Sequence, residues 1–199
     1  MPARTRATPN SVSTKARILD AAIAQLMMSG LTDWTVDEIS KRADCAKGLV
    51  TYHFQSKAKL LQLVATRVRA ARSARRTAAL SHSGADGLDG LWEALAEEVR
   101  SGSSCLWLAL LTHPETASSA TIDAAGRQHL VTTAAIALGL QATSPSLQAI
   151  PAFLDGLELQ LLMGAPEGEL REQFDRFWLD LLNTAGAGTC ASPIKVGMM

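Results

Sequence analysis

With 199 residues, 47% of them hydrophobic and 19% charged, the chain is long enough for a small module of about 50 residues joined to a larger one. The formal net charge is zero, but the charges are unevenly distributed. Up to Arg76 the chain has fourteen Lys and Arg against five Asp and Glu, and beyond Arg76 it has five Lys and Arg against fourteen Asp and Glu. Only the first part is therefore expected to attract a polyanion. Three widely spaced cysteines argue against a disulfide framework or a zinc site, and the absence of a long apolar run predicts a cytoplasmic chain without a membrane span.

The first elements follow from apolar spacing and helix-end signals. Residues 1–12 are rich in Arg, Pro and Thr, and we expect a disordered arm there. Apolar residues recur at helical spacing over Thr14–Ser29, and Gly30 follows as a stop signal, which predicts a helix. Thr35 and Glu38 then have the spacing of a capping box, which indicates the start of a second helix.

A pair of short helices is predicted next. The second helix lasts about two and a half turns, and residues 43–46 supply a tight turn before a third helical stretch at Lys47–His53. Ser56 is placed to cap a long fourth helix. We therefore expect a helix-turn-helix domain over residues 13–57 and a connecting helix over residues 58–80.

The rest of the chain is predicted to be helical as well. Ser81–Gly90 is crowded with turn-forming residues, and we expect a linker there. No alternating strand pattern occurs in the sequence, so the predicted fold class is all-α, with about nine helices. A larger helical domain is expected over residues 81–185 and a disordered tail over residues 186–199. The helices expected in this domain are Leu91–Arg100, Cys105–Thr112, about Glu115 to Gly139, one from near Ala149 to Leu162, and Leu170–Leu181.

The stretch from Lys15 to Leu61 contains an ordered set of motifs: a first helix ending in Gly30, a Thr35-Val36 entry to the second helix, then Ala46-Lys47-Gly48, Tyr52-His53-Phe54 and Ser56-Lys57. In this order and spacing it resembles the tetracycline-repressor-like (TetR) transcription regulators. The resemblance implies a homodimer that binds a palindromic operator in double-stranded DNA, represses transcription, and is released by a small-molecule effector bound in the larger domain. Weaker matches at residues 106–108 and 153–157 resemble the branch of choline-type and other metabolite-responsive repressors.

The third helix has the properties that a recognition helix needs. Such a helix must enter the major groove with small or polar residues at its N-terminal end. Gly48 allows close approach to the duplex, Lys47 and Thr51 can donate to bases or phosphates, and Tyr52 offers a hydroxyl to a phosphate. The resemblance makes Lys57 a phosphate contact. The full set of expected DNA-binding residues is Thr35, Ala46, Lys47, Gly48, Thr51, Tyr52, His53 and Lys57.

Two further sets of residues are implied by the resemblance for the larger domain. The last two helices are expected to pair with their copies across a twofold axis, burying broad apolar stripes. An effector pocket is expected among the preceding helices, although aromatic and Met residues at helical spacing pack cores first, so each candidate residue is more often plain core than pocket wall. The dimer candidates are Leu154, Leu157, Leu161, Phe174, Phe177, Trp178 and Leu181, and the pocket candidates are Trp92, Trp107, Leu110, His113, His129, Phe153 and Met163.

Two other classes of function remain open from the sequence. One is an all-helical dimeric binding module whose basic N-terminal region meets an acidic protein or a membrane surface rather than DNA. The other is an enzyme, but the sequence contains no Gly-rich phosphate loop, nucleophile elbow or metal-ligand cluster. We therefore expect no catalytic residue, no metal and no cofactor.

Overall fold

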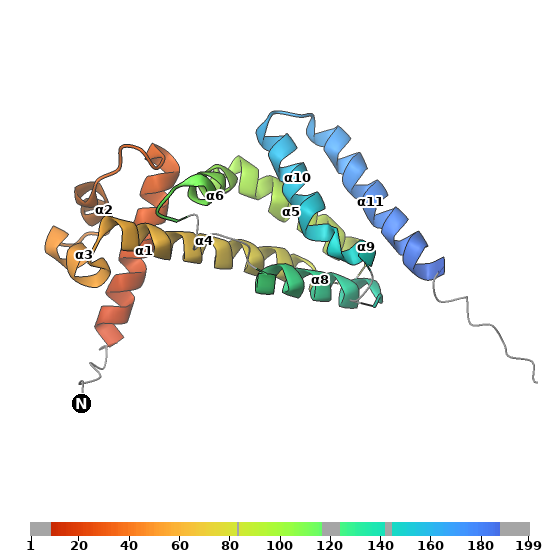
Figure 1. Cartoon of the computed structure of the whole chain (residues 1–199), viewed down its shortest axis with the longest axis horizontal. Helices are drawn as coiled ribbons and strands as arrows, with labels where there is room; N and C mark the ends of the chain where they lie inside the picture. The colour runs from red at the N-terminus through yellow and green to blue at the C-terminus, as the bar shows by residue number, and fades with distance from the viewer. Residues whose placement is uncertain (1–8, 83, 117–123, 142–144, 188–199) are drawn as a thin grey trace, which may run out of the picture. The chain divides into compact units, whose positions relative to one another are not determined.

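All regular structure in the described residues is helical, in agreement with the predicted all-α class (Figure 1). The computed structural model describes residues 9–82, 84–116, 124–141 and 145–187. The first helix begins at Pro9, so it includes four residues of the arm that we expected over residues 1–12. The rest of that arm, and nearly all of the tail expected over residues 186–199, lie outside the described residues.

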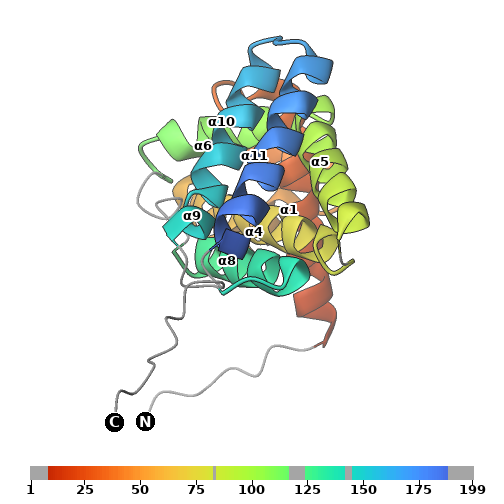
Figure 2. The same cartoon turned by 90° about the vertical axis from the view of Figure 1, so that its right-hand side faces the viewer.

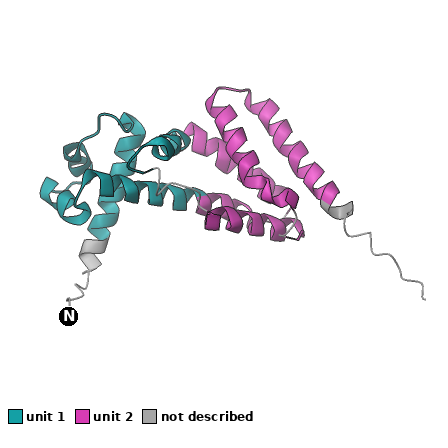
Figure 3. Ribbon diagram, in the orientation of Figure 1, with its two compact units in different colours: residues 1–72, 101–123 teal, residues 73–100, 124–199 magenta. Residues whose placement is uncertain are grey.

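The chain divides into two compact units (Figure 3). Unit 1 contains residues 1–72 and 101–123, and unit 2 contains residues 73–100 and 124–199. This division differs from the one expected from the sequence, which assigned residues 81–185 to one domain. The difference arises because the helix that follows residue 101 packs on the first helix of the chain.

Unit 1 contains the predicted helix-turn-helix. Its elements are α1 (Pro9–Ser29), α2 (Val36–Arg42), α3 (Lys47–Phe54), the first part of α4 (Lys57–Ala79), and α6 (Ser103–Thr112). Helices α1, α2 and α3 contact one another, and α6 contacts α1. The largest fully buried side chains of this unit are Ile18, Leu26, Trp34, Ile39, Phe54, Leu60 and Leu110.

Unit 2 consists of the end of α4 together with α5 (Ala85–Arg100), α8 (Ala124–Leu138), α9 (Pro145–Gln148), α10 (Ile150–Leu162) and α11 (Glu167–Ala187). Helix α10 contacts α5, α8, α9 and α11, and it lies beside α11 in both views (Figure 2). Its position among four partners makes α10 the central helix of this unit. The core contains the side chains of Leu91, Trp92, Leu95, Ile150, Leu154, Phe174 and Trp178.

The linker expected over Ser81–Gly90 is wrong in its second half, because α5 begins at Ala85. One of the glycines that suggested a linker, Gly87, serves close packing instead. A Cβ on Gly87 would overlap the carbonyl oxygen of His82, whereas one on Gly90 would lie at an ordinary contact distance, 3.5 Å, from the carbonyl oxygen of Ala79. The start of α5 therefore lies against the end of α4, where only glycine fits at position 87.

The helix expected from about Glu115 to Gly139 is also wrong at its start. Residues 113–116 form turns, and the described part of α8 begins at Ala124. The Thr116 hydroxyl is buried and donates to the carbonyl oxygen of Leu110, which ties the turn to the end of α6. By contrast, the expected start near Ala149 is confirmed: Ala149 caps α10, and Pro151 occupies its first turn, where a missing N–H costs nothing.

Candidate nucleic-acid interface

The turn between α2 and α3 is fixed by local signals at both ends of α2. The predicted capping box is confirmed, since the Glu38 amide donates to the Thr35 hydroxyl and the Thr35 amide donates to the Glu38 carboxylate. After α2 the backbone turns through Asp44, which has a φ of 47°, and the amide of Cys45 donates to the carbonyl oxygen of Ser40. The chain then enters α3 within two residues.

Helix α3 has one buried side and one exposed side. Val50 and Phe54 are each 2% exposed and pack in the core of unit 1. Tyr52 is 75% exposed, although its large aromatic ring would bury much apolar area in a core. The other exposed residues at the start of this helix are Ala46, Lys47, Gly48 and Thr51.

Gly48 is not explained by packing within the chain. A Cβ at this position would meet no other atom within 4 Å, and its φ is not in the left-handed region. The absence of a side chain therefore leaves the start of α3 flat on its exposed side. A flat helix surface is what a close approach by another molecule requires.

Each of the two lysines at this surface has a partner at the start of α2 or just before it. The ammonium of Lys57 donates to the Trp34 carbonyl oxygen over 2.8 Å and lies 4.1 Å from the centre of the Trp34 ring. The ammonium of Lys47 lies 3.1 Å from each carboxylate oxygen of Asp37. Both positive charges are thus held near residues 34–37, although the two lysines come from different helices.

Two further expected DNA-binding residues, Thr35 and His53, also have contacts within the chain. The Thr35 hydroxyl takes part in the capping box, as acceptor from the Glu38 amide and as donor to the Glu38 carboxylate. The ring of His53 is partly buried and lies edge-on to its neighbours, with centroids 5.2 Å from Tyr52 and 6.4 Å from Phe54. The other six expected residues lie on α3, directly before it, or at the first position of α4, and all are exposed.

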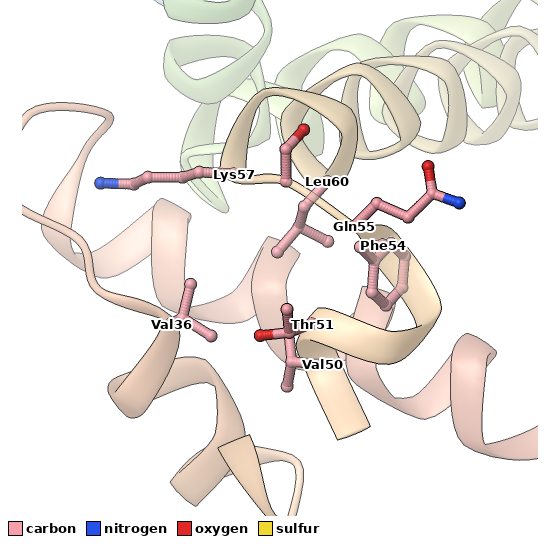
Figure 4. A pocket seen from close by; sticks show the side chains of 8 residues that line it. Val36, Val50, Thr51, Phe54, Gln55, Lys57 and Leu60 are labelled. Atoms are coloured by element: carbon pink, nitrogen blue, oxygen red, sulfur yellow. The ribbon is translucent and has the colours of Figure 1, made fainter. Parts of the chain in front are cut away.

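A small cavity of about 80 Å³ lies beside this surface (Figure 4). Val36, Val50 and Leu60 supply apolar walls, and Thr51 brings a hydroxyl to the rim. The side chain of Lys57 extends from the edge of the cavity with its ammonium directed away from these walls (Figure 4). The cavity is too small for a drug-sized ligand, for which pockets are roughly 300 Å³ or more.

The seven effector-pocket candidates divide between the two units. Trp107, Leu110 and His113 belong to unit 1, and the other four belong to unit 2. Leu110 is part of the core of unit 1, as is Trp92 in unit 2. In unit 2, His129 and Met163 are exposed, while the ring of Phe153 stacks on the ring of Phe177 at a centroid distance of 3.9 Å.

Most of the expected dimer residues are core residues of unit 2. Leu154, Leu157, Phe174, Trp178 and Leu181 are at most 4% exposed within one chain, so they are not free to meet a second copy. Leu161 and Phe177 are partly buried. The exposed large apolar side chains on α10, directly after it and on α11 are Leu159, Met163 and Leu179. The sequence analysis placed Met163 in the pocket and did not name the two leucines, because periodicity does not resolve which apolar stripe faces inward.

Two other kinds of site are not found in the part of the chain that the structure describes. No helix of the described residues combines the length and apolarity that a membrane crossing needs. Within the same residues, no three His, Cys, Asp or Glu side chains gather closely enough to hold a metal ion.

The helix-turn-helix geometry agrees with a known family in sequence as well as in structure. Residues 18–64 match the model of the N-terminal domain of bacterial regulatory proteins of the tetR family. The multidrug binding protein EbrR, in a crystal structure with imidazole, is similar over 89% of this chain and 97% of its own, with a TM-score of 0.62 and 26% identity. Residues 18–64 therefore match the DNA-binding domain of the TetR family, and most of the chain is similar in fold to a solved member of that family. A TetR-family protein from Streptomyces coelicolor is similar over 82% of this chain and 97% of its own, with a TM-score of 0.58 and 28% identity.

Two curated relatives match this chain over a short segment. The regulator SrpR from Pseudomonas putida, described as an HTH-type transcriptional regulator, is 39% identical over 51 residues. The uncharacterized regulator TtgW, also from Pseudomonas putida, is 39% identical over 51 residues as well. These segments are 26% of this chain and only 24% and 38% of the relatives. The chain therefore matches well under half of the length of either curated relative.

Proposed function

We propose that this chain is a cytoplasmic transcriptional repressor of the TetR family that binds a palindromic DNA operator as a homodimer and is released by a small-molecule inducer. The observation that carries the proposal is the exposed side of α3, where Lys47, Gly48, Thr51 and Tyr52 stand on a helix whose other side is anchored by Val50 and Phe54. A helix of this kind presents donors to base edges without rearranging its own core.

Phosphate contacts would fix the recognition helix on the duplex. Lys57, at the first position of α4, and the hydroxyl of Tyr52 are the groups we assign to the sugar-phosphate backbone. In a dimer the two copies of α3 would lie about 34 to 36 Å apart, one turn of DNA, or at a related spacing. The operator would then have the twofold symmetry of the protein.

The second copy would be bound by α10 and α11. Leu159 and Leu179 are 48% and 60% exposed, and Met163 is also exposed. Exposed apolar side chains on two neighbouring helices are typical of a surface that another chain covers. This assignment replaces the expectation from sequence, which placed the contact on residues that form the core of unit 2.

We assign the effector to unit 2, which contains most of the aromatic side chains beyond the helix-turn-helix. Trp92, Phe174, Trp178, Phe177 and Phe153 form a continuous series of ring contacts with centroids 3.9 to 5.8 Å apart. Trp92, Phe174 and Trp178 are core residues, so the partly buried Phe153 and Phe177 are the rings that a planar or cationic ligand would meet. Because solved EbrR structures contain malachite green and ethidium, these two dyes are suitable first probes. Choline is a third, from the proposed likeness to the choline-type branch.

Helix α4 would transmit the signal, because its residues belong to both units. Lys57 opens the helix in unit 1, and Arg76 near its end is buried in unit 2 against Glu98 and Glu158. An effector that changes how unit 2 packs around Arg76 would shift α4. The effector can lower DNA affinity by no more than the ratio of its own affinities for the two arrangements of α4, the shifted one and the DNA-binding one.

Footprinting of purified protein on genomic fragments, including the region upstream of its own gene, tests the DNA part of the proposal. We expect protection of a site with inverted symmetry and affinity that falls steeply with salt. Release of the protected site by malachite green, ethidium or choline would identify an inducer. Binding to anionic lipid vesicles but to no DNA fragment at low ionic strength would overturn the proposal.

A further inference from the structure

We infer that Lys15, on α1, contacts a DNA phosphate on the other side of the recognition helix from the ammonium of Lys57. The inference rests on the proposed DNA binding and adds a residue from a helix in which the sequence predicted no DNA contact. Lys15 is exposed, lies in the second turn of α1, and places its ammonium 5.8 Å from the centre of the Phe54 ring. Because Phe54 is the last residue of α3, a positive charge of α1 lies at the C-terminal end of the recognition helix.

The place of the Lys15 ammonium is set by the core beneath it. Lys15 stands three and four residues before Ile18 and Leu19, so it shares the face of α1 that packs in the core of unit 1. Phe54 is 2% exposed and belongs to the same core. A cation within about 6 Å of a ring centre is attracted to the face of the ring. The stem of Lys15 therefore lies along the edge of the core, and its charge stays at the surface beside α3.

Lys15 keeps its full charge for an incoming anion. None of the ion pairs found within the described residues includes Lys15, whereas Lys47 lies 3.1 Å from the carboxylate of Asp37. A cation–π contact uses the face of the ring and none of the three ammonium protons, so all three can still donate to oxygen. An exposed ammonium without a carboxylate partner is the kind of group that releases counterions when it meets a phosphate.

The length of α3 brings this charge to the level of the phosphates. A recognition helix contacts base edges with its N-terminal residues, which are Lys47 and Gly48 in the proposed complex. Phe54, at the other end of α3, lies about 10 Å further along the helix axis. The major groove is about 8.5 Å deep. When the start of α3 meets the bases, its C-terminal end therefore reaches the rim of the groove, where the Lys15 ammonium can donate to a phosphate oxygen.

Lys15 and Lys57 are held at different places around α3. The Lys57 ammonium donates to the carbonyl oxygen of Trp34, before the start of α2, whereas the Lys15 ammonium lies against Phe54. The Phe54 ring and the Lys57 ammonium lie on opposite sides of the small cavity that both residues line (Figure 4). The two lysines therefore bind different phosphates, and together they fix the recognition helix from two sides.

The test compares two duplexes of equal length and base composition, one with the footprinted operator and one with its sequence shuffled. Lys15→Met keeps an apolar stem and removes the charge. We expect it to bind both duplexes about tenfold more weakly at low salt, because a phosphate contact does not read the sequence. The slope of log K against log salt should flatten by about one unit per subunit. Lys15→Arg, which retains the charge and the ring contact, should keep the wild-type slope.

Two controls separate a specific contact from a general change of charge. Arg17→Met removes the same charge from an exposed residue of the same helix, about 200° around its axis from Lys15, and should change the slope by less than about half a unit. The double variant Lys15→Met with Lys57→Ala should flatten the slope by about two units per subunit, the sum of the single changes. Thermal midpoints are measured alongside, and Lys15→Gln repeats the test if the Met variant is poorly folded.

The remaining outcomes overturn the inference. A lower thermal midpoint for Lys15→Met with an unchanged slope would show that Lys15 only supports the Phe54 ring. An equal change of slope in Arg17→Met would show a general effect of charge, and a double variant no weaker than Lys57→Ala would show that the two lysines share one phosphate. Weaker binding to the operator alone would make Lys15 a base contact. If the wild type binds neither duplex, the proposed function fails as well, whereas normal wild-type binding with an unchanged slope for Lys15→Met removes only the role of Lys15.

Discussion

The ammonium of Lys57 donates to the main-chain oxygen of Trp34 over 2.8 Å while lying 4.1 Å above the ring of the same residue. One residue thus positions the lysine through two kinds of contact, a hydrogen bond and a cation–π interaction. An ammonium has three protons, and the Trp34 contact uses one of them. The remaining protons are free to reach a phosphate at the start of α4, with the direction of the lysine already fixed.

Replacing Lys57 by Ala should weaken binding to every DNA sequence by a similar factor. Because Lys57 contacts phosphate and not bases in this proposal, the operator and a shuffled duplex should lose the same affinity, and the salt slope should flatten by about one unit per subunit. Fluorescence anisotropy at a series of salt concentrations measures both quantities. An unchanged slope would remove Lys57 from the phosphate contacts.

Replacing Tyr52 by Phe tests a single hydroxyl on the exposed side of α3. The side chain is 75% exposed, so the substitution should leave the thermal midpoint unchanged. Loss of one hydrogen bond to a phosphate should weaken DNA binding by about 1 kcal/mol, or roughly fivefold. The same anisotropy titration checks the affinity, and differential scanning calorimetry checks the stability. Equal DNA affinity for the two proteins would contradict the contact.

Sequence reasoning located the helix-turn-helix well because its signals are local. The capping box of Thr35 and Glu38 and the inward side chains of Val50 and Phe54 all depend on neighbours within one helix or turn. The partner of Lys47 was missed because Asp37 lies ten residues earlier, across a turn whose geometry the spacing does not reveal. Contacts between helices depend on tertiary packing, which single-sequence patterns do not specify.

Unit 2 was harder to predict for the same reason. Periodicity correctly indicated apolar stripes on α10 and α11, but it could not separate Leu154, which is fully buried, from Leu159, which is half exposed. Composition was also misleading where glycines suggested a linker, since Gly87 permits the close contact of α5 with the end of α4. The effector pocket could not be derived, because residues on helices of different units were grouped by type alone.

Replacing Arg76 by Met should destabilise unit 2 more than replacing any exposed arginine. The guanidinium donates to Glu98 over 3.0 Å and to Glu158 over 2.7 Å, and all three side chains are at most 8% exposed. Removing one partner of a buried ionic group typically costs about 3–5 kcal/mol. Urea unfolding followed by circular dichroism measures this loss, and Arg176→Met, which breaks an exposed pair with Glu172, is the matched control with less than about 1 kcal/mol.

The charge of Arg76 should not change with pH in the ordinary range. Burial alone lowers the pKa of the Arg76 guanidinium, but the carboxylates of Glu98 and Glu158 more than offset it, so the pKa is raised. A raised pKa in the folded state stabilises the protein fully below the unfolded pKa, and the benefit is lost only as the pH rises through the folded value. The wild type should therefore lose no stability through deprotonation of Arg76 between about pH 6 and 9, which urea unfolding at several pH values checks.

The double substitution Leu159→Glu and Leu179→Glu should convert the proposed dimer into a folded monomer. These exposed leucines lie on the helices assigned to the twofold contact, and a charge placed there would be buried without a partner and face its own copy. Sedimentation velocity at micromolar concentration should show the monomer, and operator binding should be lost with it. Ile136→Glu, on the exposed surface of α8, is the matched control and should remain dimeric.

A second substitution separates this surface from the core beneath it. Leu154 is fully buried within one chain, so Leu154→Ala should lower the free energy of unfolding by about 2–5 kcal/mol. As long as the Leu154→Ala chain is folded, it should still form the proposed dimer. If instead Leu154→Ala dissociates the dimer without loss of stability, or the double Glu variant stays dimeric, the twofold contact lies on another surface. Measuring both variants by sedimentation and by urea unfolding assigns each leucine to the interface or to the core.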